Sequence, residues 1–335
     1  MRTKSWTRSI VVAACVFAAA PSGAEAIKVG AVKTGASGVV FIAQEKGFFK
    51  DEGIPAELDY FESAQPIAVA AASGAIDFGV TAPTAALYSL GGQGSVRIIA
   101  GAVQEEPGFK GAAYLVSAAA YAAGLHSLKE FAGHSFAVSQ VGSPPHYALG
   151  LLAEKFGFDI KSMRVLPLQS IPNIASAVAG GTVDATILTQ SPALLPMVER
   201  GEVKRLGWVG DETPWQFNLA FTSTRTANER ADTVAKFLRA YRRAARLYHD
   251  AFTGADGKEQ EGPGAPELLA IMGKYLGQSL DQVRLGIGYL DADVRLDVPD
   301  VLHQIAWFKE QGMLKDDVDG DALIDKRYVM PLPQR

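Results

Sequence analysis

The sequence predicts an α/β protein made of two similar lobes, each a mostly parallel sheet flanked by helices. The main observation is a repeat, since GAIDFGVTAP at 74–83 resembles GTVDATILTQSP at 181–192. In both copies a helix of small residues ends at glycine, and an aspartate then opens a short apolar strand that runs into Thr and Pro. Copies separated by roughly a hundred residues indicate two lobes rather than a solenoid of short repeats.

Length and composition agree with two lobes. The chain has 335 residues, of which 48% are hydrophobic and 20% charged, so it can bury a large core and is too long for one average domain. The formal net charge of −4 gives no electrostatic reason to expect nucleic acid as a partner. We therefore expect a well-packed protein, most simply a monomer, that does not bind nucleic acid.

The first 26 residues are typical of a secretory signal peptide. Basic residues precede an apolar stretch at 10–20, and Ala24-Glu25-Ala26 fits the small-x-small cleavage rule. A membrane anchor is the alternative, but the apolar run is shorter than the ~20 residues that span a bilayer. A lipid on Cys15 is disfavoured because Arg8 precedes it so closely. We expect cleavage after Ala26 and export to the periplasm, which leaves a mature chain without cysteine.

The mature chain begins with alternating strands and helices, as in a parallel α/β sheet. β-branched and apolar runs predict strands at 27–32, 54–61, 77–81 and 95–103, separated by helices at 39–53, 67–73 and 83–90. The second lobe repeats this alternation, with a strand near 135–138, a helix after Ser143 and a strand at 203–210. We expect the first lobe to comprise 27–115 and 220–335 and the second 116–219.

The remainder after 223 is mostly helical. Apolar residues from Val234 to Tyr248 fall three or four apart and predict one buried stripe on a long helix. The arginines between them, at 239, 242, 243 and 246, are interpreted as the solvated face of that helix rather than a nucleic-acid surface.

Five motifs in order carry a resemblance to a known family: KGFFKDEGIPAEL, a small-residue helix, GAIDFGVTAP, SLKEFAGHSFAVSQVGS and AVAGGTVDATILTQSP. In this order they resemble the nitrate/sulfonate/taurine type of periplasmic substrate-binding protein that serves ABC importers. The resemblance covers the mature chain from Ile27. It implies the type II periplasmic-binding-protein fold, crossings between the lobes near 113–117 and 216–223, a ligand in the cleft, hinge closure and a membrane permease as partner.

Loops at the carboxyl ends of the strands are the expected ligand site. Four of them, 35–38, 81–84, 140–146 and 189–192, precede helices whose first N–H groups are free to bind an anion. Of these loops and their neighbours only Lys33 offers a close cation, which argues against nitrate or a highly charged ligand. The candidate ligand-binding residues are Ser37, Gly38, Gln65, Thr81, Thr84, Ser143, His146, Tyr147, Gln190, Ser191 and Trp215.

Several of these residues have a structural alternative. Thr81 and Ser143 could instead be helix caps. Trp215 could stack on an aromatic ligand or plug the hinge, as could Phe217 beside it. Asp77 and Asp184 open their strands at the end far from the cleft, so we expect them to serve turns and caps rather than acid/base chemistry.

No motif of an enzyme or metal site is present: GxSxG, SxxK, GxxxxGK and HExxH are all missing, and the five histidines lack metal-ligand spacing. We expect no catalytic residue, metal or cofactor. The expected ligand is a small organic anion of the sulfonate or aromatic carboxylate class, or a heteroaromatic compound. The alternative is a periplasmic enzyme on the same fold, such as a pyrimidine-precursor synthase-like protein.

Overall fold

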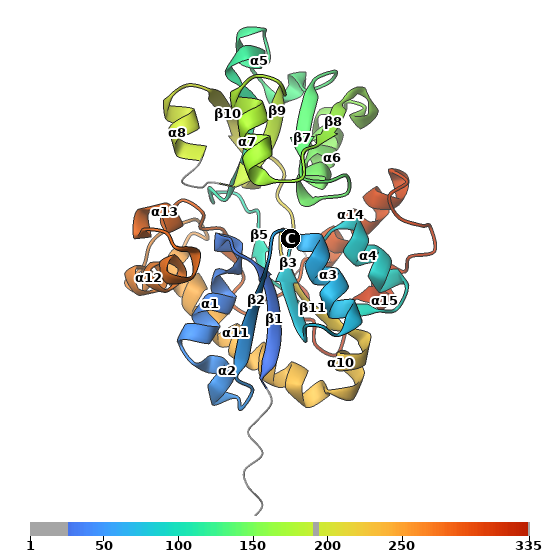
Figure 1. The fold of residues 1–335 in the computed structure, drawn as a ribbon, viewed down its shortest axis with the longest axis vertical. Coiled ribbons are helices and arrows are strands. Elements are labelled where there is room, and N and C mark those ends of the chain that lie inside the picture. Colours follow the sequence, from blue (N-terminus) through green and yellow to red (C-terminus); the bar gives the residue numbers. More distant parts are fainter. Residues whose placement is uncertain (1–25, 190–193, 334–335) are drawn as a thin grey trace, which may run out of the picture.

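Two five-stranded sheets carry the fold, seen one above the other in Figure 1. The computed structural model describes residues 26–189 and 194–333. The expected signal peptide, apart from Ala26, and the candidate residues Gln190 and Ser191 lie outside the described residues.

The first sheet has the order β2-β1-β3-β11-β4. Strand β1 pairs in parallel with β2 and β3, whereas β11 runs antiparallel to β3 and β4. Its strands are β1 (Ile27–Val32), β2 (Ala56–Phe61), β3 (Phe78–Thr81), β4 (Val96–Gly101) and β11 (Leu219–Ser223).

The second sheet repeats this plan in the order β8-β7-β9-β6-β10. Here β7 pairs in parallel with β8 and β9, and β6 is the antiparallel strand. The strands are β6 (Ala112–Ser117), β7 (Ser135–Val138), β8 (Arg164–Pro167), β9 (Ala185–Thr189) and β10 (Val203–Trp208). The two sequence repeats are thus β3 and β9, which occupy equivalent places, and the predicted pair of mostly parallel sheets is confirmed.

The antiparallel strand of each sheet lies where the chain changes sheets. Strand β6 pairs with β9 and β10 from Ala112 onward, so residues 112–115, which we expected in the first lobe, belong to the second sheet. Strand β11 returns the chain to the first sheet at Leu219. The remaining limits of the two lobes stay a proposal.

Helices cover both faces of the first sheet. On one side lie α1 (Gly38–Glu45), α2 (Phe48–Asp51), α11 (Ala231–Phe252), α12 (Ala265–Leu276) and α13 (Leu280–Arg284), and on the other α3 (Ala64–Ser73), α4 (Ala85–Gly92) and α15 (Gly320–Leu323) (Figure 1). Helix α10 (Thr224–Glu229) precedes α11, and α14 (Val298–Glu310) packs against α4. A small antiparallel pair, β5 (Val103–Gln104) with β12 (Tyr289–Leu290), adjoins this lobe.

The second sheet is flanked by the helices α5 (Ala118–Ala122), α6 (Pro144–Phe156), α7 (Ile171–Ala179), α8 (Leu194–Glu199) and α9 (Val209–Glu212). Short 3-10 turns cover 35–37, 128–130 and 160–162. No helix within 26–189 or 194–333 combines the length and the apolar character needed to cross a membrane.

Helix α11 anchors the core of the first lobe, as its predicted stripe requires. Val234, Phe237 and Tyr241 are fully buried, and the Phe237 ring stacks on Phe78 of β3 with centroids 4.0 Å apart. The opposite face carries the arginines, of which Arg239, Arg243 and Arg246 pair with surface carboxylates. The helix is therefore amphipathic in the predicted sense, and these exposed ion pairs contribute little to stability.

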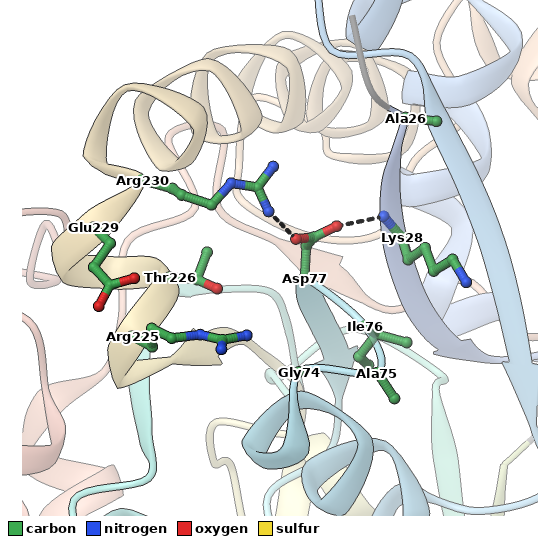
Figure 2. Close-up of a pocket in the computed structure, with 10 residues that line it drawn as sticks. All are labelled: Ala26, Lys28, Gly74, Ala75, Ile76, Asp77, Arg225, Thr226, Glu229 and Arg230. Atoms are coloured by element: carbon green, nitrogen blue, oxygen red, sulfur yellow. Dashed lines mark hydrogen bonds and ion pairs between the residues drawn. The ribbon is translucent and has the colours of Figure 1, made fainter.

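The two repeat aspartates, Asp77 and Asp184, make equivalent hydrogen bonds in the two lobes. Asp77 Oδ2 accepts the backbone N–H of Lys28 at 2.8 Å, and Asp184 Oδ2 accepts that of Ser135 at 2.8 Å. Each carboxylate thereby ties the start of its own strand to the start of the neighbouring strand. Figure 2 shows Asp77 between the Lys28 backbone and the Arg230 side chain, beside a hollow of about 370 Å³ at this edge of the sheet. Both aspartates therefore have a structural role, as predicted, but among the described residues they join neighbouring strands and do not cap a turn or helix.

Candidate functional site

The carboxyl ends of the parallel strands β1, β2 and β3 face the second lobe (Figure 1). The lobes touch there directly, because the Ala85 N–H at the start of α4 donates to the Gly142 carbonyl before α6 at 3.1 Å. Beside this contact lies a groove of about 540 Å³, lined by Gln65, Pro66, Val69, Ala70 and Gln140. Its walls come from α3 of the first lobe and from the loop after β7 of the second, which makes it part of the cleft between the lobes.

Two crossover segments join the lobes, one containing Glu105 and the other containing Trp215, and their backbones pair with each other. The Glu105 N–H donates to the Trp215 carbonyl at 3.0 Å, and the Trp215 N–H donates back to the Glu105 carbonyl at 3.1 Å. The buried Gln216 side chain donates to the Asn218 carbonyl at 2.6 Å and accepts from Gln104 Nε2 at 3.2 Å. These bonds satisfy amides that have no access to water, as buried polar groups require.

Glu105 is a buried carboxyl group in the first of these crossover segments. Its side chain is 4% exposed, and burial raises its pKa to about 7, opposed by a hydrogen bond from the Ala112 N–H. Desolvation dominates because the charged form loses its hydration at this site.

Gln65 was predicted in the loop before the helix at 67–73, but α3 begins at Ala64 and Gln65 stands in its first turn. Gln65 lines the groove together with Gln140, and its ligand role stays a prediction. Gln140 was not among the candidate residues, although it begins the predicted loop 140–146. The sequence predicts the position of this loop, but it does not show which side chain of the loop faces the other lobe.

Ser143 and Trp215 hold buried polar atoms that lack a protein partner among the described residues, namely the Ser143 Oγ and the Trp215 Nε1. Ser143 precedes α6 and is 4% exposed, yet its hydroxyl caps no backbone N–H of that helix. The Trp215 ring is 5% exposed and packs edge to face on Tyr147 and Phe217. An unsatisfied buried donor costs about 1–3 kcal/mol, so both atoms call for an explanation beyond packing.

The neighbouring threonines have ordinary structural roles. Thr84 Oγ1 accepts the Leu87 N–H at 3.1 Å, so this residue is the N-cap of α4. Thr81 is buried at the end of β3, opposite Leu219 of β11. The capping alternative therefore describes Thr84 in this structure, whereas neither Thr81 nor Ser143 acts as a side-chain cap.

Ser37 and Gly38 begin α1 at the cleft end of β1. The Ser37 hydroxyl donates to the Val32 carbonyl at 2.7 Å, which closes the loop after the strand. A Cβ on Gly38 would lie 2.6 Å from Met272 Cε, at the flexible end of a side chain of α12, so α1 and α12 pack closely at this point. Both residues lie at the N-terminus of α1. The Ser37 hydroxyl is engaged within its own loop, and Gly38 has no side chain to offer a ligand.

Tyr147 and His146 face helix α14, not the open cleft. Tyr147 is fully buried, and its hydroxyl lies 2.8 Å from both Asp300 Oδ1 and His303 Nδ1. His146 Nδ1 accepts the Gly142 N–H at 3.2 Å, and burial lowers the pKa of its ring to about 4. The placement of both side chains in the cleft is corrected here, because a helix about 150 residues later in the chain covers this face of α6.

Comparison with known proteins identifies the family of this chain. A family model described as "NMT1/THI5 like" matches residues 36–251. The chain belongs to this NMT1/THI5-like family. No curated protein matches the sequence.

Solved structures share the fold of this NMT1/THI5-like protein at low identity. The alkanesulfonate-binding protein SsuA from Xanthomonas axonopodis pv. citri, bound to MOPS, is 18% identical with a TM-score of 0.68, covering 90% of this chain and 98% of that chain. The nitrate-binding protein NrtA from Synechocystis PCC 6803 is 14% identical with a TM-score of 0.65, covering 91% and 86%. The desulfurization enzyme DSZB is 15% identical with a TM-score of 0.63, covering 92% and 96%. The fold is that of the periplasmic binding proteins, as the sequence resemblance implies.

Metal-binding groups were sought in the same structure. Across the described ranges, no three or more side chains of His, Cys, Asp or Glu are grouped so that they could hold a metal ion. The polar side chains that line the groove of this NMT1/THI5-like protein are the amides of Gln65 and Gln140, which can hold a ligand through hydrogen bonds.

Proposed function

We propose that this NMT1/THI5-like protein is the periplasmic solute-binding component of an ABC importer. It captures a small organic anion of the sulfonate or aromatic carboxylate class, or a heteroaromatic compound, between its lobes and delivers it to a membrane permease without catalysis. The observation that carries the proposal is the pair of buried donors, Ser143 Oγ–H and Trp215 Nε1–H, that have no protein partner in the described residues where the lobes meet.

The chemistry of these groups favours an acceptor-rich, weakly charged ligand. A hydroxyl and an indole N–H both donate to carboxylate, sulfonate or ring-nitrogen acceptors. Helix α6 adds the positive end of its dipole, which favours negative charge, although its first two residues, Pro144 and Pro145, carry no N–H. The residues that line the groove include no cation, so in this proposal the binding energy comes from hydrogen bonds and apolar contact.

The fold supplies the motion that such a protein needs. The lobes are joined by two crossover segments, and the contact from Ala85 to Gly142 closes one side of the cleft. A ligand that contacts both walls would bind better to the closed arrangement and so shift the equilibrium towards it. The closed form is then the state that a permease recognises.

A thermal-shift panel of alkyl and aryl sulfonates, aromatic carboxylates and pyrimidines tests the proposal. A ligand at about a hundred times its Kd should add about 2.7 kcal/mol to stability, which corresponds to a shift of several degrees. The absence of a shift from every compound would count against a binding protein. Product formation, followed by mass spectrometry of the same mixtures, would instead support an enzyme on this fold, as the likeness to DSZB allows.

Paired variants separate binding from capping. Ser143→Ala removes a hydroxyl that has no partner in the described structure, so it should leave the melting temperature of the free protein unchanged or raise it, while ligand affinity falls. Thr84→Ala is the matched control, because it removes a working cap and should cost about 1 kcal/mol of stability. If Ser143→Ala lost as much stability as the control and kept full affinity, Ser143 would be a structural residue.

A further inference from the structure

We propose that Asp300 is a positioning residue for the cleft. Its two carboxylate oxygens hold the two segments that carry Ser143 and Trp215 in a fixed mutual arrangement. The consequence for ligand binding rests on the proposed function, whereas the contacts themselves do not.

The two oxygens of Asp300 reach different parts of the molecule. Oδ1 accepts the Tyr147 hydroxyl at 2.8 Å, and Tyr147 lies one helical turn after Ser143 on α6. Oδ2 accepts the Gln216 backbone N–H at 2.9 Å, and Gln216 directly follows Trp215. One carboxylate thus connects the second lobe with the return crossover, at positions adjacent to both unpartnered donors.

The position of Asp300 on its helix suits a charged group. It is the third residue of α14, where Asp297 caps the helix and accepts the Asp300 N–H at 3.1 Å. The N-terminus of a helix favours negative charge, which offsets part of the cost of placing a carboxylate in this partly buried site. An amide of the same shape has one acceptor oxygen instead of two and carries no charge, so it would lose the charge-assisted bonds and could meet the Tyr147 hydroxyl only as a donor.

Helix α14 forms a rigid support around this carboxylate. Gln304 Nε2 donates to Asp300 Oδ2 at 2.7 Å and to the Gln216 carbonyl at 3.1 Å, and its Oε1 accepts the Tyr88 hydroxyl at 2.8 Å. The Trp307 ring packs directly on the α6 backbone, because a Cβ on Gly150 would lie 2.3 Å from Trp307 Cε2. The support comes from residues 298–310, beyond the 36–251 match to the family model.

Hydrogen exchange of Asp300→Asn tests the positioning role without any ligand. The variant should speed exchange of backbone amides about tenfold in both 142–149 and 213–218, as expected from loss of a hydrogen bond to a charged group. Asp291→Asn is the matched control, since Asp291 is also buried and accepts bonds from Arg295 and two backbone N–H groups within its own segment. The control should leave exchange in both segments unchanged.

Tyr147→Phe tests the contacts of the two Asp300 oxygens separately. It removes the bond to Asp300 Oδ1, together with the contact to His303 Nδ1, and leaves the bond from Asp300 to Gln216, so faster exchange is expected in 142–149 only. A residue that merely stabilised the fold would change exchange throughout the protein. If Asp300→Asn does not fold, Tyr147→Phe with this one-sided pattern still decides the question.

Binding measurements complete the test. With a ligand identified by thermal shift, Asp300→Asn should raise its Kd about tenfold or more, while Asp291→Asn changes it by less than about twofold. Unchanged exchange in the two segments, or equal loss of affinity in both variants, overturns the inference. If no compound binds the wild-type protein, the proposed function fails, whereas the exchange comparison still decides whether Asp300 holds the two segments.

Discussion

Glu105 and His146 give the protein two opposed dependences of stability on pH. Burial raises the pKa of Glu105 from 4.5 to about 7 and lowers the pKa of His146 from 6.5 to about 4. Each change corresponds to about 3 kcal/mol of differential stability between the two protonation states. Both side chains lie where the lobes meet, one in a crossover and the other on α6.

The sign of each pH dependence follows from the difference in proton binding between the folded and unfolded states. The folded state holds the Glu105 proton more tightly than the unfolded state, so its contribution is complete below pH 4.5 and is lost as the pH rises through about 7. The unfolded state takes up the His146 proton first, so its contribution is complete above pH 6.5 and is lost as the pH falls to about 4. Between pH 4.5 and 6.5 the two contributions change in opposite directions and nearly cancel in the wild-type protein.

Single substitutions should expose each contribution. Glu105→Gln keeps an acceptor for the Ala112 N–H but cannot titrate, so its free energy of unfolding should fall by about 3 kcal/mol on acidification from pH 6.5 to about 4. His146→Asn keeps an acceptor for the Gly142 N–H, and its stability should fall by a similar amount as the pH rises from 4.5 to about 7.

Denaturant unfolding across this pH range, followed by circular dichroism, measures the free energies directly. The comparison is made at fixed salt and without ligand, because a bound ligand adds its own pH dependence. If both variants keep the pH profile of the wild-type protein, the buried titrations of Glu105 and His146 do not set it and the reasoning fails. A profile that changes in only one variant refutes the assignment of the other residue.

Two further substitutions test the packing of the lobes and the role of the repeat aspartates. Gly150→Ala places a methyl group 2.3 Å from Trp307 Cε2, so it should lower the free energy of unfolding by about 1–3 kcal/mol, and an unchanged denaturation midpoint would contradict the close packing of α6 on α14. Asp77→Asn weakens the bonds to the Lys28 N–H and to Arg230, so it should cost about 1–2 kcal/mol of stability. Ligand affinity, measured by calorimetry, should remain unchanged because Asp77 lies at the far edge of the sheet; weaker binding would place Asp77 in the site after all.

The sequence predicted the fold well because its signals are local. The repeated glycine and aspartate mark the start of β3 and β9, and strand and helix alternation predicts the parallel sheets. The same local signals predict that α6 starts after Ser143. They do not show which distant element covers a given face, so Tyr147 was expected in the cleft although Asp300 and His303 of α14 occupy that side.

The internal repeat also locates function within the scaffold. At the edge where strands begin, Asp77 and Asp184 make the same bond in both lobes, which is what a purely structural requirement produces. At the opposite edge the copies differ. Ser37 and Ser143 each precede the helix that follows the first parallel strand of their sheet, yet the Ser37 hydroxyl binds the Val32 carbonyl, whereas the Ser143 hydroxyl has no partner in the described structure. Because Ser37 shows that this position can satisfy its hydroxyl locally, the free hydroxyl of Ser143 supports the proposed ligand contact, which the Ser143→Ala measurement tests.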